Sequence, residues 1–226
     1  MNTLTANKNT YIQRHWLILG SMVPAVGMLI LFSTILPGVF GGYVWSFVLS
    51  AAFLGFAIVK KDKAFFKVIF FSYAAGIAEL LPDHWLVAYT GTLFYPDQIK
   101  IYSSPLYMPF AWSVVLIQLG YIGWLFGRKF GKWTASFAMV ALGIAIIPLY
   151  EHWAINAGWW HYENSPMFIG EIPYYIMLAE GLLMFTIPAF FDSAAEAGWK
   201  KIGLYGFLQG MVMWLACIIA WYTIGY

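Results

Sequence analysis

The sequence has few charged residues: Asp, Glu, Lys and Arg fill 10% of its 226 positions, against about 25% in an average soluble domain. It has one cysteine, Cys217, so neither a disulfide framework nor a thiolate metal site can form within one chain. Its four widely spread histidines cannot build the histidine-rich di-iron site of membrane desaturases. The net charge of +2 gives no reason to expect a nucleic-acid partner.

Several catalytic motifs are also missing. The sequence shows no clear phosphate-binding glycine loop, GxSxG elbow or dinucleotide fingerprint. Asp83 and Asp97 do not form a DDxxD-type motif, so metal-assisted ionisation of a diphosphate lacks its ligands. The last apolar run has no central lysine, which disfavours a Schiff-base retinal protein. We therefore expect no metal and no cofactor, and chemistry that starts with proton donation to an alkene or epoxide remains compatible.

Apolar sequence dominates instead. Hydrophobic residues make up 62% of the chain, and the mean hydropathy is +0.73. Apolar runs near the ~20 residues that cross a bilayer recur along the whole chain. This pattern predicts an all-α polytopic membrane protein that forms a single domain, 1–226, with about seven transmembrane helices. The predicted spans are Trp16–Leu36, Tyr43–Val59, Phe65–Leu81 with an extension toward Tyr89, Leu106–Phe126, Thr134–Ala157, Met167–Phe191 and Ile202–Ile224.

The basic residues alternate between the loops. In a seven-span protein, the four clusters of Lys and Arg listed below fall in loops on one side of the membrane. Lys100 falls on the opposite side. The positive-inside rule therefore predicts a cytoplasmic N-terminus, and a C-terminus on the opposite side of the membrane. The acids and histidines then gather at the non-cytoplasmic end. The basic groups are Lys8 with Arg14, Lys60 with Lys61 and Lys63, Arg128 with Lys129 and Lys132, and Lys200 with Lys201.

An internal repeat is visible. Asp83-His84-Trp85 matches Glu151-His152-Trp153 at a spacing of 68 residues, near the end of an apolar run in both cases. Aligning Ser104-Pro105 with Ser165-Pro166 makes the first loop seven residues longer than the second. Spans three and four (roughly 65–127) and spans five and six (134–191) are thus predicted to be two parallel helical hairpins. Such repeats place a site at their interface.

Ionisable side chains inside a membrane protein are costly, so where they gather is the default functional site. Glu151 and His152 are candidates for an acid–base pair, and Asn156 shares a helix face with His152. The alternative is a helix-end pair solvated by headgroups and water.

Glu79 and Asp83 are four residues apart and share a face, and His84 follows them. Either two carboxyls face one cavity, so that one keeps its proton, or Asp83 lies in the interface and Glu79 pairs with a neighbour.

Glu180 lies about a dozen residues into the predicted sixth span, among apolar neighbours. A carboxyl there is expected to stay neutral and to act as a proton donor. The alternative is a helix–helix hydrogen bond, with Gly181 allowing close packing. Glu171 is a further candidate, although it can instead cap the start of the helix.

Aromatic residues make up 20% of the chain, and many of them belong to the belts at the two membrane interfaces. Those near the acids form a candidate binding wall, because Trp and Tyr faces attract cations. We expect this wall to bind the substrate and to stabilise a carbocation. With Asn156, the candidates are Trp85, Tyr89, Trp153, Trp159, Trp160, Tyr162, Tyr174 and Tyr175.

The segment from Glu151 to Phe185 resembles the integral-membrane lycopene cyclases of the small-subunit kind. The turn Gly158-Trp159-Trp160-His161-Tyr162 and Pro173 carry the resemblance, whereas Tyr174 and Tyr175 stand where that family has paired acids. The seven-span membrane terpene cyclases of meroterpenoid pathways are a more distant comparison. The resemblance implies a related fold and a non-redox cyclisation or isomerisation of an isoprenoid, and it does not fix the substrate.

We therefore predict a membrane-embedded isoprenoid cyclase or isomerase that is started by a carboxylic acid. Glu180, Glu151, Glu79 or Asp83 donates the proton, and His152 or His84 with a carboxylate takes the final one. The predicted partners are a lipophilic isoprenoid and membrane lipids. The alternative is a non-enzymatic binder or carrier of a hydrophobic ligand or pigment. The sequence leaves the first donor and the oligomeric state open.

Overall fold

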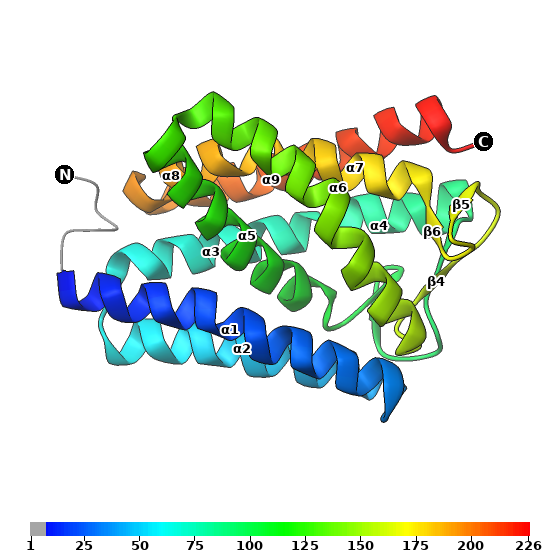
Figure 1. The fold of residues 1–226 in the computed structure, drawn as a ribbon, viewed down its shortest axis with the longest axis horizontal. Helices are drawn as coiled ribbons and strands as arrows, with labels where there is room; N and C mark the ends of the chain where they lie inside the picture. Colours follow the sequence, from blue (N-terminus) through cyan, green and yellow to red (C-terminus); the bar gives the residue numbers. More distant parts are fainter. Residues whose placement is uncertain (1–7) are drawn as a thin grey trace.

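The computed structural model describes residues 8–226, and seven of its helical segments are long and apolar enough to cross a membrane, as predicted. They run back and forth as one bundle (Figure 1). The helices are α1 (Lys8–Thr34), α2 (Phe40–Val59), α3 (Lys63–Ala78), α4 (Leu80–Trp85), the π-helix η2 (Leu86–Thr90), α5 (Met108–Phe130), α6 (Lys132–Asn156), α7 (Tyr174–Met184), α8 (Ile187–Glu196) and α9 (Trp199–Ile224). The third span combines α3, α4 and η2, and the sixth combines α7 and α8.

The predicted bounds of the spans hold to within a few residues except in two places. The first helix begins at Lys8 rather than Trp16, because polar residues continue the helix beyond the apolar run. The sixth span begins at Tyr174 rather than Met167, because residues 167–173 form a β-hairpin that ends at Pro173. Apolar composition alone does not distinguish such a hairpin from the first turns of a helix.

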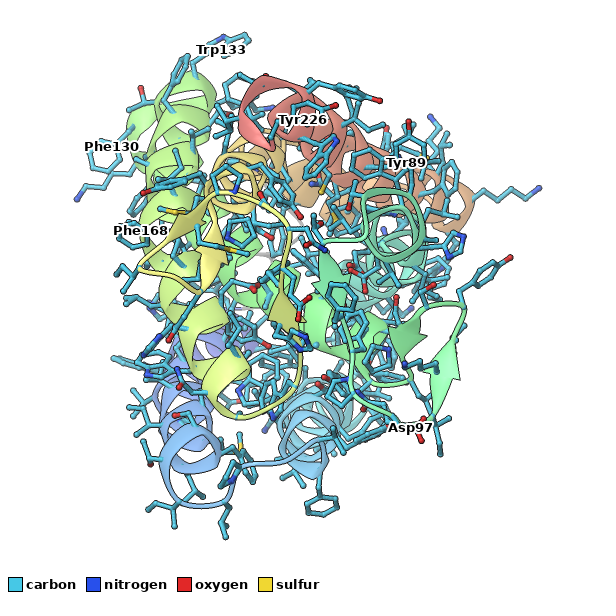
Figure 2. The ribbon with its side chains drawn as sticks, turned by 90° about the vertical axis from the view of Figure 1, so that its right-hand side faces the viewer. Tyr89, Asp97, Phe130, Trp133, Phe168 and Tyr226 are labelled. Carbon is cyan, nitrogen blue, oxygen red and sulfur yellow. The ribbon has the colours of Figure 1, made fainter. Side chains whose placement is uncertain are left out.

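Short strands cap one end of the bundle, and Figure 2 looks onto this end. They are β1 (Leu93–Phe94), β2 (Lys100–Ile101), β3 (Ser104–Pro105), β4 (His161–Tyr162), β5 (Met167–Phe168) and β6 (Ile172–Pro173). The strands β2 and β3 pair with each other, as do β5 and β6. The antiparallel pair β1–β4 joins the two loops, with Leu93 opposite Tyr162. The loop between the third and fourth spans is therefore hydrogen-bonded to the loop between the fifth and sixth.

The order of elements is the same in the two predicted repeats. Each has a long helical segment, a strand of the β1–β4 pair, a β-hairpin and a second helix. The hairpin ends at Pro105 before α5 and at Pro173 before α7, which are again 68 residues apart. The alignment of Ser104-Pro105 with Ser165-Pro166 and the longer first loop were therefore wrong. The repeat itself stays a prediction, now with a spacing of 68 residues at both the triplets and the prolines.

Close helix contacts fix how the two hairpins and α9 pack. A Cβ on Gly181 of α7 would lie 2.6 Å from Ile144 of α6, and a Cβ on Gly143 would lie 2.8 Å from the carbonyl oxygen of Glu180. Gly206 of α9 is equally close to the backbone of α3. Small residues let membrane helices approach in this way. Glu180 is thus held on a helix that has little room to shift.

A buried ion pair lies at the end opposite the cap. Arg14 of α1 donates to Asp62 Oδ2 at 2.6 Å, and both side chains are almost fully buried. The other oxygen of Asp62 accepts the backbone N–H of Phe65 and caps the start of α3. The sequence analysis treated Arg14 as a loop charge before the first span, which was wrong because α1 begins six residues earlier.

Candidate functional site

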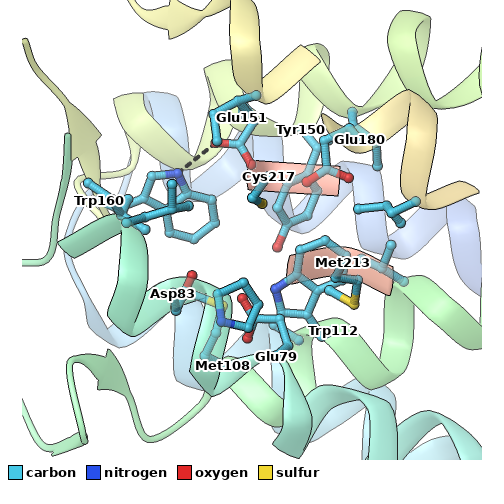
Figure 3. Close-up of a pocket in the computed structure, with 18 of the residues that line it drawn as sticks. Glu79, Asp83, Met108, Trp112, Tyr150, Glu151, Trp160, Glu180, Met213 and Cys217 are labelled. Atoms are coloured by element: carbon cyan, nitrogen blue, oxygen red, sulfur yellow. Dashed lines mark hydrogen bonds between the residues drawn. The ribbon is translucent and has the colours of Figure 1, made fainter. Parts of the chain in front are cut away.

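A cavity lies between the two predicted hairpins, α9 and the cap (Figure 3). Four carboxyl groups line it, and Cys217 lies among them. Including the part that opens to solvent, the space between these side chains amounts to about 700 Å³. The lining residues are Glu79, Pro82, Asp83, Leu86, Leu93, Tyr95, Met108, Ala111, Trp112, Val115, Ile147, Tyr150, Glu151, Trp160, Tyr162, Ile176, Glu180, Leu183, Met213 and Cys217.

One wall carries Glu79 and Asp83, which are 3% and 5% exposed. Pro82 lacks the N–H that would bond to Ala78, and the helix is interrupted at Glu79. The hydroxyl of Tyr95, just after β1, donates to Asp83 Oδ2 at 2.6 Å. The indole of Trp112 on α5 lies within hydrogen-bonding reach of Glu79. This wall thus has two acids, and each lies near a donor.

The opposite wall carries Glu151 and Glu180, both 7% exposed. The indole N–H of Trp160 donates to Glu151 Oε2 at 2.8 Å, and the Tyr162 hydroxyl lies within reach of the same carboxyl. Glu180 comes from the middle of α7, six residues after its start at Tyr174 rather than a dozen into the span. Among residues 8–226, no hydrogen-bond partner reaches Oε2 of Glu180. Glu180 therefore presents an unpaired oxygen at a largely apolar surface.

The tyrosines of the cap act as proton-bearing donors. Burial raises the pKa of Tyr95 well above its usual range, and the carboxyls of Asp83 and Glu79 raise it further. Burial likewise raises the pKa of Tyr162, with Glu151 as the next cause. Both phenols keep their protons near neutral pH, so each can donate to a carboxyl group.

The predicted 68-residue register relates one pair of acids in the lining of the two walls. Asp83 and Glu151 occupy equivalent positions, and Tyr95 corresponds to Tyr162 at a spacing of 67. Elsewhere the walls differ. Ile147 stands where the first hairpin has Glu79, and Trp112 stands where the second has Glu180. Tyr150 and Trp160 align with Pro82 and Thr92. The two walls therefore share one acid position and differ in the position of the other acid.

Six of the predicted site residues line the cavity: Glu79, Asp83, Glu151, Trp160, Tyr162 and Glu180. The predicted histidines do not line it. His152 is exposed and pairs with Glu171 at 2.6 Å, and His84 is exposed beside Ser103 at 2.8 Å. Glu171 therefore meets His152 at the outer surface instead of capping α7. The structure gives neither histidine a place from which it could take a proton in the cavity.

The remaining aromatic candidates also lie outside the cavity lining. Trp85 stacks on the exposed Tyr89, Tyr174 is exposed, and the exposed Asn156 donates to the backbone of His152. Trp153 is half-buried against the core. Trp159 and Tyr175 are fully buried, and the Tyr175 hydroxyl bonds to Thr92 at 2.6 Å. These residues support the helix ends and the cap.

Sequence reasoning missed several lining residues, chiefly Trp112, Tyr150, Met213 and Cys217. The register at a constant spacing of 68 would have found Trp112, because it aligns with Glu180. Nothing in the sequence pointed to Met213 and Cys217, since their place depends on how α9 packs against α3. Within the described residues, no group of three or more His, Cys, Asp or Glu side chains is arranged to hold a metal ion.

Fold and cavity together define a class: an all-α protein with seven helices apolar enough to span a membrane and a carboxyl-lined cavity between two of its helical hairpins. The family described as "Domain of unknown function (DUF6989)" matches residues 80–224, which is more than half of the chain, so the chain belongs to this family. The matched segment contains Asp83, Glu151 and Glu180, and it leaves out α1, α2, α3 and Glu79. No curated protein and no solved structure matches the chain.

Proposed function

We propose that this protein is a membrane-embedded cyclase or isomerase of a lipophilic isoprenoid, started by protonation of an alkene or epoxide. The observation that carries the proposal is the cavity with four buried carboxyls whose lining, within the described residues, includes no Lys, Arg or His. Burying several like charges without a cation is very unfavourable. The cavity therefore keeps some of these groups as neutral carboxylic acids, which are proton donors.

The aromatic lining suits the intermediate of such a reaction. Trp112, Tyr150 and Trp160 border the same space as the acids, and the Tyr150 hydroxyl points between the two walls (Figure 3). Aromatic faces stabilise a nearby cation by about 0.5–2 kcal/mol each. The apolar side chains between the acids offer water few hydrogen-bond partners near a carbocation. These features support cyclisation or isomerisation more than hydration.

The lining also suits an uncharged substrate. A phosphate or diphosphate would meet four carboxyls and no basic side chain, so an anionic substrate is disfavoured. An isoprenoid that dissolves in the bilayer would instead match the apolar residues between the acids. The resemblance to lycopene cyclases supports the same class and leaves the individual substrate open.

The orientation is part of the proposal. The basic groups at the α2–α3 and α5–α6 turns lie at the end opposite the cap (Figure 1). The positive-inside rule then puts that end and the N-terminus in the cytoplasm. The cavity and the C-terminus belong to the other side of the membrane.

The test is expression in a host that makes linear carotenoid and polyprenyl precursors, with lipid extracts read by mass spectrometry. Wild type is compared with Glu151→Gln and Glu180→Gln, and with Glu163→Gln as a control at an exposed acid outside the cavity. A cyclic or isomerised product that is absent from either cavity variant and present in the control supports the proposal. An unchanged lipid that co-purifies with the protein, without any product, would instead identify a binder or carrier.

A further inference from the structure

The two walls of the cavity are not chemically equivalent. Each has one acid at a position shared by the two hairpins, Asp83 or Glu151, and one acid at an unshared position. On the first wall the unshared acid, Glu79, lies near the Trp112 indole. On the second wall the unshared acid is Glu180, and the position that corresponds to Glu79 is the apolar Ile147. Glu180 thus lacks the neighbouring donor that Glu79 has.

The shared acids are each held by a hydrogen-bond donor from the cap. Tyr95 donates to Asp83 at 2.6 Å, and Trp160 donates to Glu151 at 2.8 Å. A donor N–H or O–H stabilises a carboxylate more than a neutral acid, since the carboxylate only accepts. These donors favour the carboxylate form of Asp83 and Glu151 over the neutral acid, and the carboxylate is the form that receives a proton.

Glu180 is arranged as the neutral acid. Its Oε2 has no partner within residues 8–226, and the whole residue is 7% exposed. Glu79 Oε2 is also without a partner, so what distinguishes Glu180 is the lack of a nearby donor comparable to Trp112. The charge of Glu151 acts on it from the same wall, so a second negative charge there is unfavourable. The packing of α6 against α7 at Gly143 and Gly181 keeps it in place. Figure 3 shows its carboxyl directed toward the cavity, across from Asp83 and Glu79.

We propose that Glu180 delivers the proton that starts the reaction and that Asp83, on the opposite wall, receives the proton that ends it. This assignment rests on the proposed function. The O–H bond of Glu180 breaks, and its proton joins one carbon of a substrate double bond through the π electrons. The other carbon becomes a cation, and Glu180 becomes a carboxylate.

The second half of the reaction consumes the cation. A further double bond can attack it to close a ring, which moves the positive charge to a new carbon. A neighbouring C–H bond then breaks, its electrons form a double bond, and the proton passes to Asp83. The product is an isomer of the substrate. The protein returns to its first state when Glu180 takes up a proton from water and Asp83 releases one.

Glu151 is a positioning residue in this scheme. It does not need to touch the substrate, because its negative charge next to Glu180 keeps the donor neutral between turnovers. Trp160 holds that charge in place through its indole N–H. The first wall has its own pair, in which Tyr95 holds Asp83 ready to accept.

The experiment uses the full chain, purified into lipid nanodiscs, with the precursor that gave a product in the expression screen. The reaction runs in D2O, and the product is analysed for deuterium and for the position of its double bonds. We expect wild type to add one deuterium to each product molecule. Glu180→Gln should lower the rate by about 10²–10⁴-fold, as expected for loss of a general acid.

Asp83→Asn should act differently. The cation still forms with its deuterium, but deprotonation occurs elsewhere, so double-bond isomers or water adducts replace the normal product. The control Glu163→Gln should match wild type in rate and product. Wild-type turnover by Glu180→Gln, or an unchanged product ratio and rate in Asp83→Asn, would overturn the assignment while leaving the proposed function intact.

Two further outcomes are distinguishable. If wild type converts no precursor at all, the proposed function and this assignment fall together. If Glu180→Gln does not elute as a single species in size-exclusion chromatography, the experiment uses Glu180→Asp instead. This variant keeps the carboxyl group but places it one methylene further from the substrate. A rate at least about tenfold lower with the same deuterated product supports the donor role, and an unchanged rate contradicts it.

Discussion

The protein buries ionisable side chains at both ends of the bundle, and the two places are built in opposite ways. Away from the cap, Arg14 and Asp62 form one ion pair at 2.6 Å, and Asp62 also caps α3. Beside the cap, four carboxyls share a cavity that no basic side chain lines among the described residues. The first arrangement satisfies its charges and connects α1 to α3. The second leaves oxygens of Glu79 and Glu180 unpaired, which costs stability and marks a candidate functional site.

Breaking the Arg14–Asp62 ion pair should produce the largest change in stability. Asp62→Asn leaves Arg14 as a buried charge without its carboxylate and should lower the free energy of unfolding by about 3–5 kcal/mol. The measurement is unfolding in mixed micelles followed by circular dichroism. The pair Lys132–Asp192, at 3.5 Å with side chains 71% and 28% exposed, supplies the control. Lys132→Ala should change stability by less than about 1 kcal/mol, and equal effects of the two variants would contradict the contrast.

Removing a cap donor should have the next largest effect. Tyr95→Phe deletes the hydroxyl that donates to Asp83 and should destabilise the protein by about 1.5–3 kcal/mol, as for a hydrogen bond to a charged group. Tyr174→Phe is the matched control, because Tyr174 is exposed and lies outside the cavity. Equal unfolding curves for Tyr95→Phe and wild type would show that Asp83 does not depend on this donor.

Removing an unpaired acid should stabilise the protein, in contrast to the two variants above. Glu180→Leu replaces a buried carboxyl that has an unsatisfied oxygen with an apolar side chain of similar size. We expect it to raise the free energy of unfolding by about 1–3 kcal/mol while abolishing the proposed activity. Glu163→Leu, at an exposed acid, serves as the comparison. A Glu180→Leu protein that unfolds more easily than wild type would mean that Glu180 holds the fold together.

The smallest effect is expected at the outer surface. His152 and Glu171 meet at 2.6 Å, but their side chains are 48% and 33% exposed. His152→Gln should therefore change stability by less than about 1 kcal/mol. It should also leave product formation in the expression screen unchanged, because His152 does not line the cavity. Loss of product in this variant would restore the histidine to the proposed mechanism.

Much of the fold could be predicted because it depends on local composition. Each apolar run near 20 residues predicted a span, and all seven are present. The error at Met167 arose because β5 and β6 are as apolar as the helix that follows, and Pro173 marks a start that hydropathy alone does not resolve. The buried Arg14 was missed because a basic residue near a terminus usually lies in solvent.

The candidate site could be predicted only in part. The acids at positions 83 and 151 were visible from their repeated triplets, and Glu180 from its apolar surroundings. The adjacent His84 and His152 belong to the same triplets, yet they face outward because neighbouring residues on a helix point about 100° apart. Trp112 and Tyr150 carry no signal of their own, since isolated aromatics also occur in belts and cores.

The sequence by itself determined the seven spans and the small number of charged residues. The reason is that a bilayer is crossed by long apolar helices, in which an acidic residue is costly and therefore easy to recognise. It also determined that acids recur at a spacing of 68 residues. Only the tertiary structure decided which acids face one another and which donors from the cap reach them. It also brought Cys217 of α9 into the same cavity. The physical reason is that helix contacts, such as that of Gly181 with Ile144, set the rotation and tilt of each helix, and these depend on side chains far apart in the chain.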